Sequence, residues 1–372
     1  MNTFSVINYQ GSKKKLSEFL YNNIYPYLEK DKAFLDIFSG SGAVCNTFKN
    51  VTTVYANDAE KYSSLISDAI LNKPEISDWN IEKLTIHKSI LSIIKQKKAP
   101  YSILLKKEHS FVNDKDLDSL VDLYNSIPTV WNEKKSLLYS GVTTVEKARN
   151  YGDYYLFTQY YSNSYFGLLQ AIEIDSIIEY IKTENNKLNS SLFSCLFYAM
   201  KEASFSKDGH LAQPLDFSKN KTKLFLQRSK SILKLFEKKL DEYISYTPGI
   251  YNGRSIIYNE DFKDLLKKLE NNQIGIIYAD PPYTDMQYSR YYHLLNIAIE
   301  YNYPELTKKG MNYTNGLYTV GRFQSNLSKK KYARLELEEL IKYCKRNDIK
   351  LALSYAFPCN VNKQKTDRKH VL

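Results

Sequence analysis

The sequence predicts an α/β fold, a Rossmann-like parallel sheet interrupted by a long, mainly helical insert. Three observations predict it. Two stretches near the ends of the chain alternate short apolar runs with helical segments, the stretch between them has helical periodicity, and successive apolar runs end in an acidic residue. With 372 residues, of which 43% are hydrophobic, the chain has enough apolar side chains for a large buried core.

The five predicted strands fall into two groups. The first group contains "KAFLDIF" at 32–38, which leads into a glycine-rich turn and a helix, and "VTTVYAND" at 51–58. The second group contains three β-rich runs, separated by helices that we expect at about 262–271 and 331–346. These runs are "SIIYNED" at 255–261, "IGIIYAD" at 274–280 and "KLALSY" at 350–355. Strands that alternate with helices in this way predict one parallel sheet.

Residues 63–250 form the predicted insert, because they contain few strand signals and much amphipathic periodicity. The sheet domain is therefore expected to be discontinuous and to comprise 1–62 and 251–372. Within the insert, the aromatic segment "GDYYLFTQYYSNSYFGLLQ" at 152–170 has two interpretations. It is either the core of a helical domain in a tyrosine-rich protein or a surface on which nucleic-acid bases stack.

The composition of the chain limits the classes of function that are consistent with the sequence. The net charge of +11 and the pI near 9.1 suit a polyanionic partner such as nucleic acid, although a lysine-rich composition is also typical of an AT-rich genome. The N-terminus lacks the apolar region of a signal peptide and no apolar run approaches ~18 residues, so we expect a soluble, intracellular protein. The four cysteines and five histidines have no ligand spacing, so neither disulfides nor a metal site is predicted.

The turn "DIFSGSG" at 36–42 predicts a ligand site. Gly40 and Gly42 follow a strand, where the missing side chains allow close approach of a ligand to the backbone and to the N–H groups of the next helix. The turn lacks the G-x-x-x-x-G-K-[ST] of a phosphate-binding loop and departs from the dinucleotide G-x-G-x-x-G. This spacing favours a nucleoside without phosphates.

Acidic residues end four of the predicted strands. Because the carboxyl ends of parallel strands meet at one edge of a sheet, these side chains are expected to cluster there, where open α/β sheets bind ligands. They are Asp36, Asp58, Asp261 and Asp280. Asp58, after the second strand, stands where an acid can accept two hydrogen bonds from a ribose diol.

The set of motifs resembles the adenine-specific DNA methyltransferases of the Dam-like type, which depend on S-adenosylmethionine. Hallmarks of that family are a D-P-P-Y tetrapeptide, an F-x-G-x-G turn and an early Y-x-G-x-K. In family order this chain has "YQGSK" at 9–13, "DIFSGSG" at 36–42, "ND" at 57–58, "NEDF" at 259–262, "DPPY" at 280–283 and "SY" at 354–355. A recognition insert before the tetrapeptide matches the arrangement called alpha.

The resemblance implies S-adenosyl-L-methionine as the cofactor and assigns residues to it. Gly40 and Gly42, with Phe38 and Asp36 of the same motif, would line its pocket, and Asp58 would bind its ribose. Its adenine would be held by Asp261 and Phe262. Residues Tyr9, Gly11 and Lys13 would close over its methionine part.

The tetrapeptide has a chemical rationale in this setting. The adenine amino nitrogen is a poor nucleophile because its lone pair is delocalised into the ring. Asp280 carboxylate and the Pro281 carbonyl would each accept one of its N–H groups, while Pro281 and Pro282 fix the backbone that aims both acceptors. Tyr283 would stack on the adenine, which must be flipped out of the duplex. Transfer is then a direct in-line displacement without a covalent enzyme intermediate.

The resemblance implies a site-specific enzyme that methylates adenine N6 in double-stranded DNA, as the modification part of a restriction-modification system. Its expected partners are duplex DNA and a cognate restriction endonuclease, without a membrane, in the bacterial cytoplasm and at the nucleoid. The family pattern also expects a final sheet hairpin after "LALSY", whereas only residues 356–372 follow. We therefore expect a sheet that lacks this hairpin, either through truncation or through a shorter natural end.

Three alternatives stay open at this point. Pro358 and Cys359 form the dipeptide that cytosine C5 methyltransferases use as a nucleophile, but here the pair follows the last strand and coexists with the tetrapeptide. The second alternative is an enzyme that uses the same cofactor but methylates cytosine N4, RNA adenine or a protein amide. The third is a catalytically inactive DNA-binding protein on a methyltransferase fold, which measured methyl transfer would exclude.

Overall fold

The structure is a computed structural model of the chain. It describes residues 4–7, 16–126, 154–184, 187–207, 210–247, 255–269, 273–282 and 288–355. Its contacts divide the chain into two compact units, which we call the sheet unit and the helical unit. The sheet unit comprises Met1–Lys73, Tyr246–Ser289 and Phe323–Leu372, and the helical unit comprises Pro74–Ser245 and Arg290–Arg322. The helical unit thus includes 290–322, a segment that the sequence assigned to the sheet domain.

The sheet unit contains a five-stranded sheet in which every pair is parallel, as predicted. The strand order is β3-β2-β1-β4-β7. The order reverses between β1 and β4, which makes their carboxyl ends the topological switch point where such sheets bind ligands. The strands are β1 (Ala33–Asp36), β2 (Val54–Asn57), β3 (Ile256–Tyr258), β4 (Ile274–Ala279) and β7 (Lys350–Leu353).

The central strands β1 and β4 are buried along their whole length. Successive side chains of a strand point to opposite faces, so neighbours in the sequence enter different cores. Leu35 packs in an apolar cluster with Leu266 and Leu340, whereas Phe34 packs in another with Leu20 and Phe48. Both faces of the sheet are therefore covered, which explains why its central strands read as continuous apolar runs.

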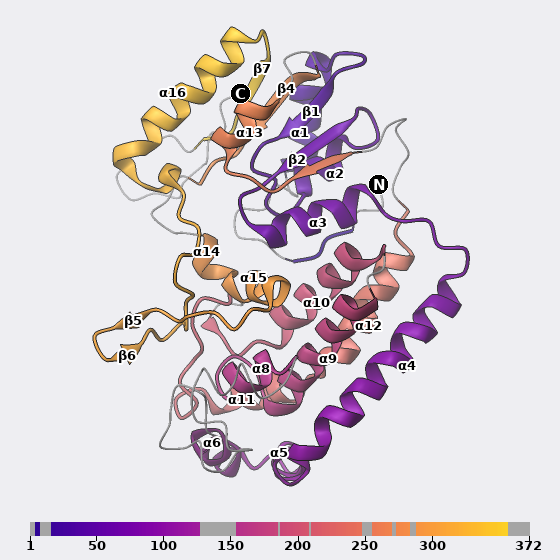
Figure 1. Cartoon of the computed structure of the whole chain (residues 1–372), viewed down its shortest axis with the longest axis vertical. Coiled ribbons are helices and arrows are strands. Elements are labelled where there is room, and N and C mark those ends of the chain that lie inside the picture. The colour runs from indigo at the N-terminus through magenta and orange to yellow at the C-terminus, as the bar shows by residue number, and fades with distance from the viewer. Residues whose placement is uncertain are drawn as a thin grey trace. The chain divides into compact units, whose positions relative to one another are not determined.

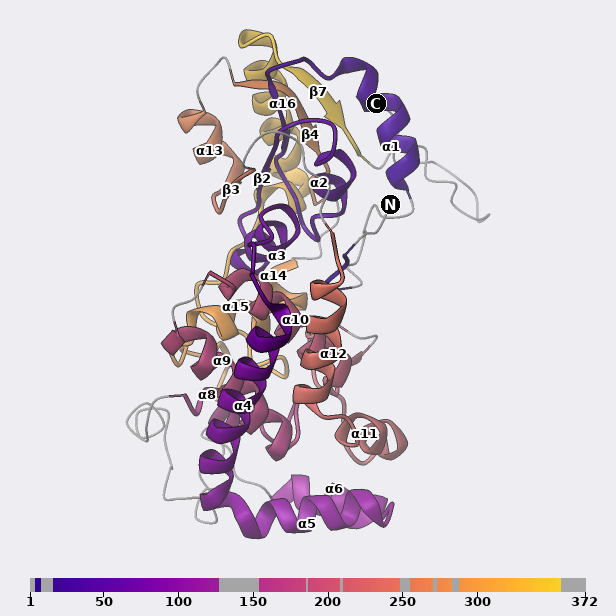
Figure 2. The ribbon, with the colours of Figure 1, turned by 90° about the vertical axis from the view of Figure 1, so that its right-hand side faces the viewer.

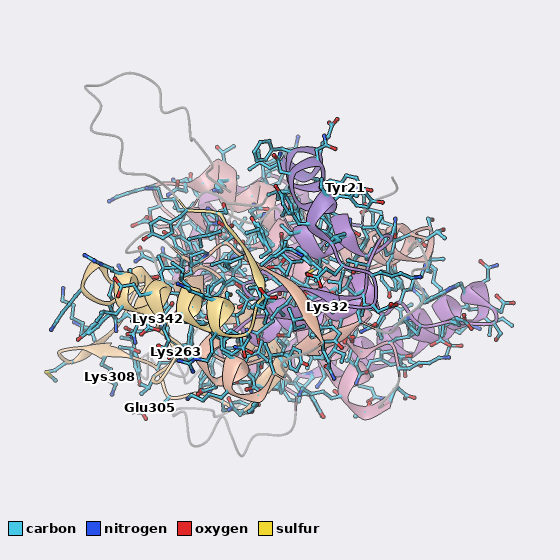
Figure 3. All side chains as sticks on the ribbon, turned by 90° about the horizontal axis from the view of Figure 1, so that it is seen from above. Tyr21, Lys32, Lys263, Glu305, Lys308 and Lys342 are labelled. Carbon is cyan, nitrogen blue, oxygen red and sulfur yellow. The ribbon has the colours of Figure 1, made fainter. Side chains whose placement is uncertain are left out.

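Helices supply the two covering layers. On one face lie α13 (Phe262–Lys268) and α16 (Lys330–Arg346), which confirm the two helices predicted in this part of the chain. Lys263 of α13, which is labelled in Figure 3, pairs with Glu336 of α16 at 2.9 Å. On the other face lie α1 (Ser17–Ile24) and α2 (Ala43–Phe48). Figure 2 shows α13 and α1 on opposite sides of the strands.

The helical unit is built mainly from packed helices (Figure 1). Within it, α10 packs against α12, and α9 packs against α4, α8 and α10. Its helices are α4 (Trp79–Lys98), α5 (Ser102–Asn113), α6 (Leu117–Ser126), α8 (Leu156–Tyr160), α9 (Leu168–Glu184), α10 (Asn189–Ala203), α11 (Lys221–Arg228), α12 (Ile232–Ile244) and α15 (His293–Glu300). The short helix α14 (Tyr288–Tyr291) begins in the sheet unit and ends in the helical unit. A hairpin of β5 (Lys308–Lys309) and β6 (Asn312–Tyr313) follows α15.

The aromatic segment forms part of the helical core. Its side chains Phe157, Tyr160, Tyr161, Tyr165 and Phe166 are fully buried. They contact one another edge to face or at a tilt, the arrangement that aromatic quadrupoles favour. The core interpretation is therefore confirmed for these residues, and the base-stacking interpretation is wrong for them.

Three buried carboxylates of the helical unit accept backbone N–H groups at helix N-termini. Asp175 receives the N–H groups of Phe157 and Thr158 at 2.9 and 2.7 Å. Glu108 and Glu173 make the equivalent pairs of bonds at the starts of α9 and α12. The first N–H groups of a helix have no partner within the helix, so these acids stabilise it through hydrogen bonds and through the helix dipole.

Two further findings concern the described residues as a set. No helix among them is long and apolar enough to cross a membrane. Within the same ranges, no three residues of the His, Cys, Asp and Glu types lie close enough together to hold a metal ion.

Candidate active site

Three carboxylates meet at the carboxyl edge of the sheet. Asp36 is the last residue of β1, and Asp58 and Asp280 directly follow β2 and β4. The charges of Asp280 and Asp58 both raise the pKa of Asp36, so the three groups are near enough to interact. All three belong to the sheet unit. The structure thus brings together three of the four acids that the sequence predicted to cluster.

Asp36 is the most buried of these acids, with 1% of its surface exposed. Burial raises its pKa to about 7, and the negative charges of Asp280 and Asp58 add to this effect. The Cys45 thiol, which donates to Oδ2 at 3.3 Å, and the backbone N–H of Phe38 oppose it. Oδ1 of Asp36 is buried and accepts no hydrogen bond of ordinary geometry from the described residues. A buried, unsatisfied carboxylate oxygen next to two other acids favours a cation or hydrogen-bond donor.

The glycine turn follows directly. Gly40 and Gly42 adopt left-handed φ values of 51° and 70°, which residues with a side chain rarely take. Gly42 also has no room for one, because a Cβ there would lie 2.9 Å from Cδ1 of Ile70. The N–H of Gly42 donates to the carbonyl of Ser39 at 2.8 Å and closes the turn before α2 begins. The two glycines are thus required by backbone conformation.

Hydrogen bonds of the Asp58 side chain link the end of β2 to this glycine turn. Its Oδ2 accepts the N–H of Gly40 and its Oδ1 accepts the N–H of Glu60, both at 2.9 Å. Burial raises the pKa of Asp58, although these bonds and one from Ser63 act in the opposite direction. A carboxylate has about four acceptor sites, so Asp58 keeps capacity for a further hydrogen bond from a ligand.

Asn57 is a structural residue that the sequence analysis did not select. Its side-chain amide donates to the carbonyls of Ile37 and Glu260, and its Oδ1 accepts the N–H of Glu260. The side chain therefore joins the loops that follow β1 and β3. The "ND" pair in the motif series was the available signal, but the contact with Glu260 is made across 203 residues of sequence.

Asp261 and Phe262 lie at the start of α13. The Asp261 carboxylate caps this helix by accepting the N–H of Lys263 at 3.0 Å. Phe262 is 5% exposed and packs in an apolar cluster, with its ring centroid 5.4 Å from that of Phe38. Asp261 therefore stabilises the start of α13 and Phe262 contributes to the apolar core, in addition to any role toward a ligand.

The first three residues of the tetrapeptide continue from a rigid strand. The carbonyl of Tyr278 accepts the N–H of Ile37, and that of Ala279 accepts the N–H of Ser354 at 2.8 Å. Strand pairing on both sides therefore reaches the residue before Asp280. Pro281 is buried and Pro282 half-buried. The other predicted site residues, Tyr9, Gly11, Lys13 and Tyr283, lie outside the described residues.

This arrangement is typical of Rossmann-like enzymes that bind a nucleoside-containing ligand at the switch point of a parallel sheet. A family model described as D12 class N6 adenine-specific DNA methyltransferase matches residues 9–101 and 104–334. The chain therefore belongs to the D12 class of N6 adenine-specific DNA methyltransferases.

Curated relatives agree with this assignment. The chain is 26% identical over 312 residues to the type II methyltransferase M.NlaIII of Neisseria lactamica, covering 82% of this chain and 72% of that protein. It is 24% identical over 340 residues to the modification methylase LlaI of Lactococcus lactis subsp. lactis, and 27% over 300 residues to the type II methyltransferase M.FokI of Planomicrobium okeanokoites. These matches cover 90% and 78% of this chain but only 44% and 37% of the relatives. No solved structure matches the chain significantly.

Proposed function

We propose that this chain methylates adenine N6 at one specific sequence in duplex DNA, with S-adenosylmethionine as methyl donor. We also propose that it is the modification part of a restriction-modification system, acting on chromosomal DNA beside a cognate endonuclease. The observation that carries this proposal is the position of Asp280 and Pro281 at the switch point of the sheet, next to Asp36 and Asp58, in a chain of this family. The names of the relatives, which are modification methylases and type II methyltransferases, support it.

The residues at the sheet edge fit this cofactor. Three interacting acids and the unsatisfied Oδ1 of Asp36 suit a ligand that carries positive charge and hydrogen-bond donors. S-adenosylmethionine has both and would supply a methyl group activated by its positive sulfur. Asp58 would accept the ribose hydroxyls, and Gly40 and Gly42 would leave space for the ligand. The remaining proposed cofactor residues are Phe38, Asp261, Phe262, Tyr9, Gly11 and Lys13.

Asp280 and Pro281 would prepare the nucleophile. The adenine amino nitrogen becomes reactive when its lone pair is turned away from the ring, and two fixed acceptors on its N–H groups favour that geometry. The Asp280 carboxylate would take one N–H and the Pro281 carbonyl the other. The strand pairing before Asp280 and the restricted φ of the two prolines would hold both acceptors in place. Preorganised acceptors of this kind need no rearrangement during the reaction.

The DNA would be bound by both units. Tyr283 would stack on the flipped adenine and return part of the few kcal/mol that unstacking costs. The helical unit, which contains most of the predicted insert 63–250, would recognise the sequence. Its side chains that contact base edges would set specificity, while phosphate contacts would set position.

The test is methylation in vitro with sequencing of the product. The protein is incubated with S-adenosylmethionine and long unmethylated duplex DNA, which is then sequenced by a method that detects both N6-methyladenine and methylcytosines. We expect N6-methyladenine at every occurrence of one short sequence. Methylcytosine alone, or no methylation by a folded protein that still binds DNA, would refute the proposal.

A further inference from the structure

A hairpin of the helical unit carries the most exposed large apolar residue in the described part of the chain. This residue is Met311, which is 96% exposed, against 73% for Ile103, the next in order. It lies in the turn between β5 and β6, and Figure 1 shows this hairpin extending away from the helices of its unit. We call the residues Lys308–Tyr313 the hairpin tip. Because Met311 buries almost no surface, its apolar side chain adds nothing to the stability of the fold.

Turn chemistry does not explain a methionine at this position. The antiparallel pairing of β5 with β6 makes Gly310 and Met311 a two-residue connection. Gly310 has a left-handed φ of 63°, which hairpin turns with glycine at their first central position require. The second position of such turns is usually glycine or a small polar residue, and methionine is neither.

The hairpin is firmly anchored at its base. The N–H of Thr307 donates to the carbonyl of Tyr318 at 2.7 Å, and the hydroxyl of Tyr165 donates to the carbonyl of Gly316 at 3.0 Å. Leu317 is 6% exposed and keeps a left-handed φ of 49°, which a residue with a side chain keeps only where the surrounding packing fixes it. The exposed tip is therefore held in a defined place on the helical unit.

The hairpin tip also carries positive charge. Lys308 and Lys309 are exposed, and among the described residues neither forms an ion pair with a carboxylate. The ammonium group of Lys308, which is labelled in Figure 3, lies 4.9 Å from the ring centroid of Tyr313. Residues 306–320 contain no Asp or Glu. The charge of the two lysines is thus not compensated locally and suits a polyanionic partner.

This combination matches the major groove of duplex DNA, the polyanion on which the family of this chain acts. The groove is about 12 Å wide and admits a two-stranded β-ribbon. Phosphates line its sides, and base edges, including the methyl group of thymine, form its floor. An apolar side chain at the end of a hairpin can reach that floor while lysines beside it reach the phosphates.

We propose that the hairpin tip enters the major groove of the DNA, where Lys308 and Lys309 each bind a backbone phosphate and Met311 contacts thymine methyl groups. This inference rests on the proposed function and names one element through which the chain holds its DNA. The lysine contacts position the duplex without reading its sequence. The methionine contact favours thymine over bases that lack the methyl group and therefore contributes to specificity.

The first part of the test measures binding of a fluorescently labelled, AT-rich DNA duplex at several salt concentrations. Lys308→Ala and Lys309→Ala should each reduce the salt slope by about 0.9, the value for one lost phosphate contact, and K308A/K309A should reduce it by about 1.8. Met311→Ala removes no charge, so it should bind about tenfold more weakly with an unchanged salt slope.

The second part replaces every thymine of this duplex by uracil, which lacks only the methyl group. The unaltered protein should bind the uracil duplex about fourfold more weakly, as expected for one lost methyl contact. Met311→Ala should bind the two duplexes equally. A thymine preference that persists in Met311→Ala, or none in the unaltered protein, would refute the contact of Met311 with the groove floor.

Matched controls come from α16 of the sheet unit. Leu335→Ala removes an apolar residue that is 62% exposed and shares its helix face with Glu338 and Glu339, whose charges repel DNA. Lys345→Ala removes an exposed lysine at the end of α16, which leads into the start of β7 and hence lies at the sheet edge opposite the candidate active site. Both should bind DNA as the unaltered protein does. Thermal unfolding and binding of S-adenosylmethionine should be unchanged in Met311→Ala, because this residue is almost fully exposed.

The possible failures are distinguishable. If the unaltered protein neither binds nor methylates DNA, the proposed function fails and the inference fails with it. If it binds DNA without methylating it, the proposed function alone is refuted, and the salt slopes still decide the inference. If it does both while the three single variants keep full affinity and salt slope, only the inference is refuted. Should K308A/K309A not fold, the single variants decide the matter.

Discussion

The Cys45 thiol and the Asp36 carboxylate form a buried hydrogen bond of 3.3 Å, in which Sγ donates to Oδ2. Burial raises the pKa of Cys45, so the thiol stays protonated and remains the donor. The bond links the end of β1 to α2 immediately beside the glycine turn. Oδ1 of Asp36 remains without a hydrogen bond from the described residues. Ionisation of this carboxylate without a ligand therefore carries a large free-energy penalty.

The first prediction concerns stability and pH. Burial raises the pKa of Asp36 from its ordinary value of 3.8 to about 7 in the folded protein, so the folded state binds this proton more tightly. Its contribution to stability is therefore fully present below about pH 4 and is lost as the pH rises to 7. Asp36→Asn should unfold at the same urea concentration as the unaltered protein near pH 4. At about pH 8 it should be more stable, by up to ~4 kcal/mol.

The same substitution should weaken the affinity for S-adenosylmethionine, because it removes a negative charge and an acceptor from the predicted pocket. Calorimetric titration measures this affinity. Gain of stability together with loss of affinity is the result that separates a ligand-binding acid from a purely structural one. Equal pH dependence of stability in the two proteins would contradict the proposed ionisation of Asp36.

The sheet was predictable because its signals are local. Each strand is a short apolar run that ends in a polar turn, and α13 and α16 follow their strands with clear helical periodicity. The acids at the strand ends could then be placed together from topology alone, since a parallel sheet puts all carboxyl ends at one edge. The composition of the aromatic segment at 152–170 left two interpretations open, and only the burial of its side chains in the structure decided between them.

Other features depend on contacts between distant segments and leave no local signal. Asn57 joins two loops through its hydrogen bonds with Glu260. The ring of Tyr318 contacts the guanidinium groups of Arg290 and Arg322, which are 32 residues apart in the sequence. The segment 290–322 belongs to the helical unit because Tyr165 and Asp175 bind Gly316 and Tyr301. Such pairings are decided by packing, and neither periodicity nor turn chemistry reveals them.

The second prediction concerns the tetrapeptide. Asp280→Asn keeps a hydrogen-bond acceptor but loses the charge, and Asp280→Ala loses both, so methyl transfer should fall by about 10²-fold or more in each. Affinity for S-adenosylmethionine should be largely retained. Initial rates with labelled cofactor and DNA measure the first effect, and calorimetry the second. Asp264→Ala, an exposed acid of α13 paired with Lys267, is the control and should remain fully active. Loss of cofactor binding in Asp280→Ala would mean that this residue is misassigned.

The third prediction concerns Asp58, whose removal should have the opposite signature. Asp58→Ala leaves the N–H groups of Gly40 and Glu60 without their acceptor and deletes the predicted partner of the ribose. Because both losses affect the cofactor pocket, KM for S-adenosylmethionine should rise by roughly tenfold or more. At saturating cofactor the rate of transfer should fall much less. A fall in rate at saturation with unchanged KM would assign Asp58 to the chemical step.

The last prediction uses two glycines with similar backbone angles. Gly42 and Gly310 have φ values of 70° and 63°. Because a left-handed conformation is unfavourable for a residue with a side chain, alanine at either position should lower the free energy of unfolding by about 1–2 kcal/mol. At Gly310 a Cβ meets nothing within 4 Å, whereas at Gly42 it would lie 2.9 Å from Cδ1 of Ile70. Gly42→Ala should therefore destabilise the protein more in urea unfolding, and it alone should weaken cofactor binding. Ile70→Val deletes the clashing methyl group, so Gly42→Ala should cost less in that background than in the unaltered chain. Equal losses at the two glycines would show that the turn before α2 tolerates a side chain.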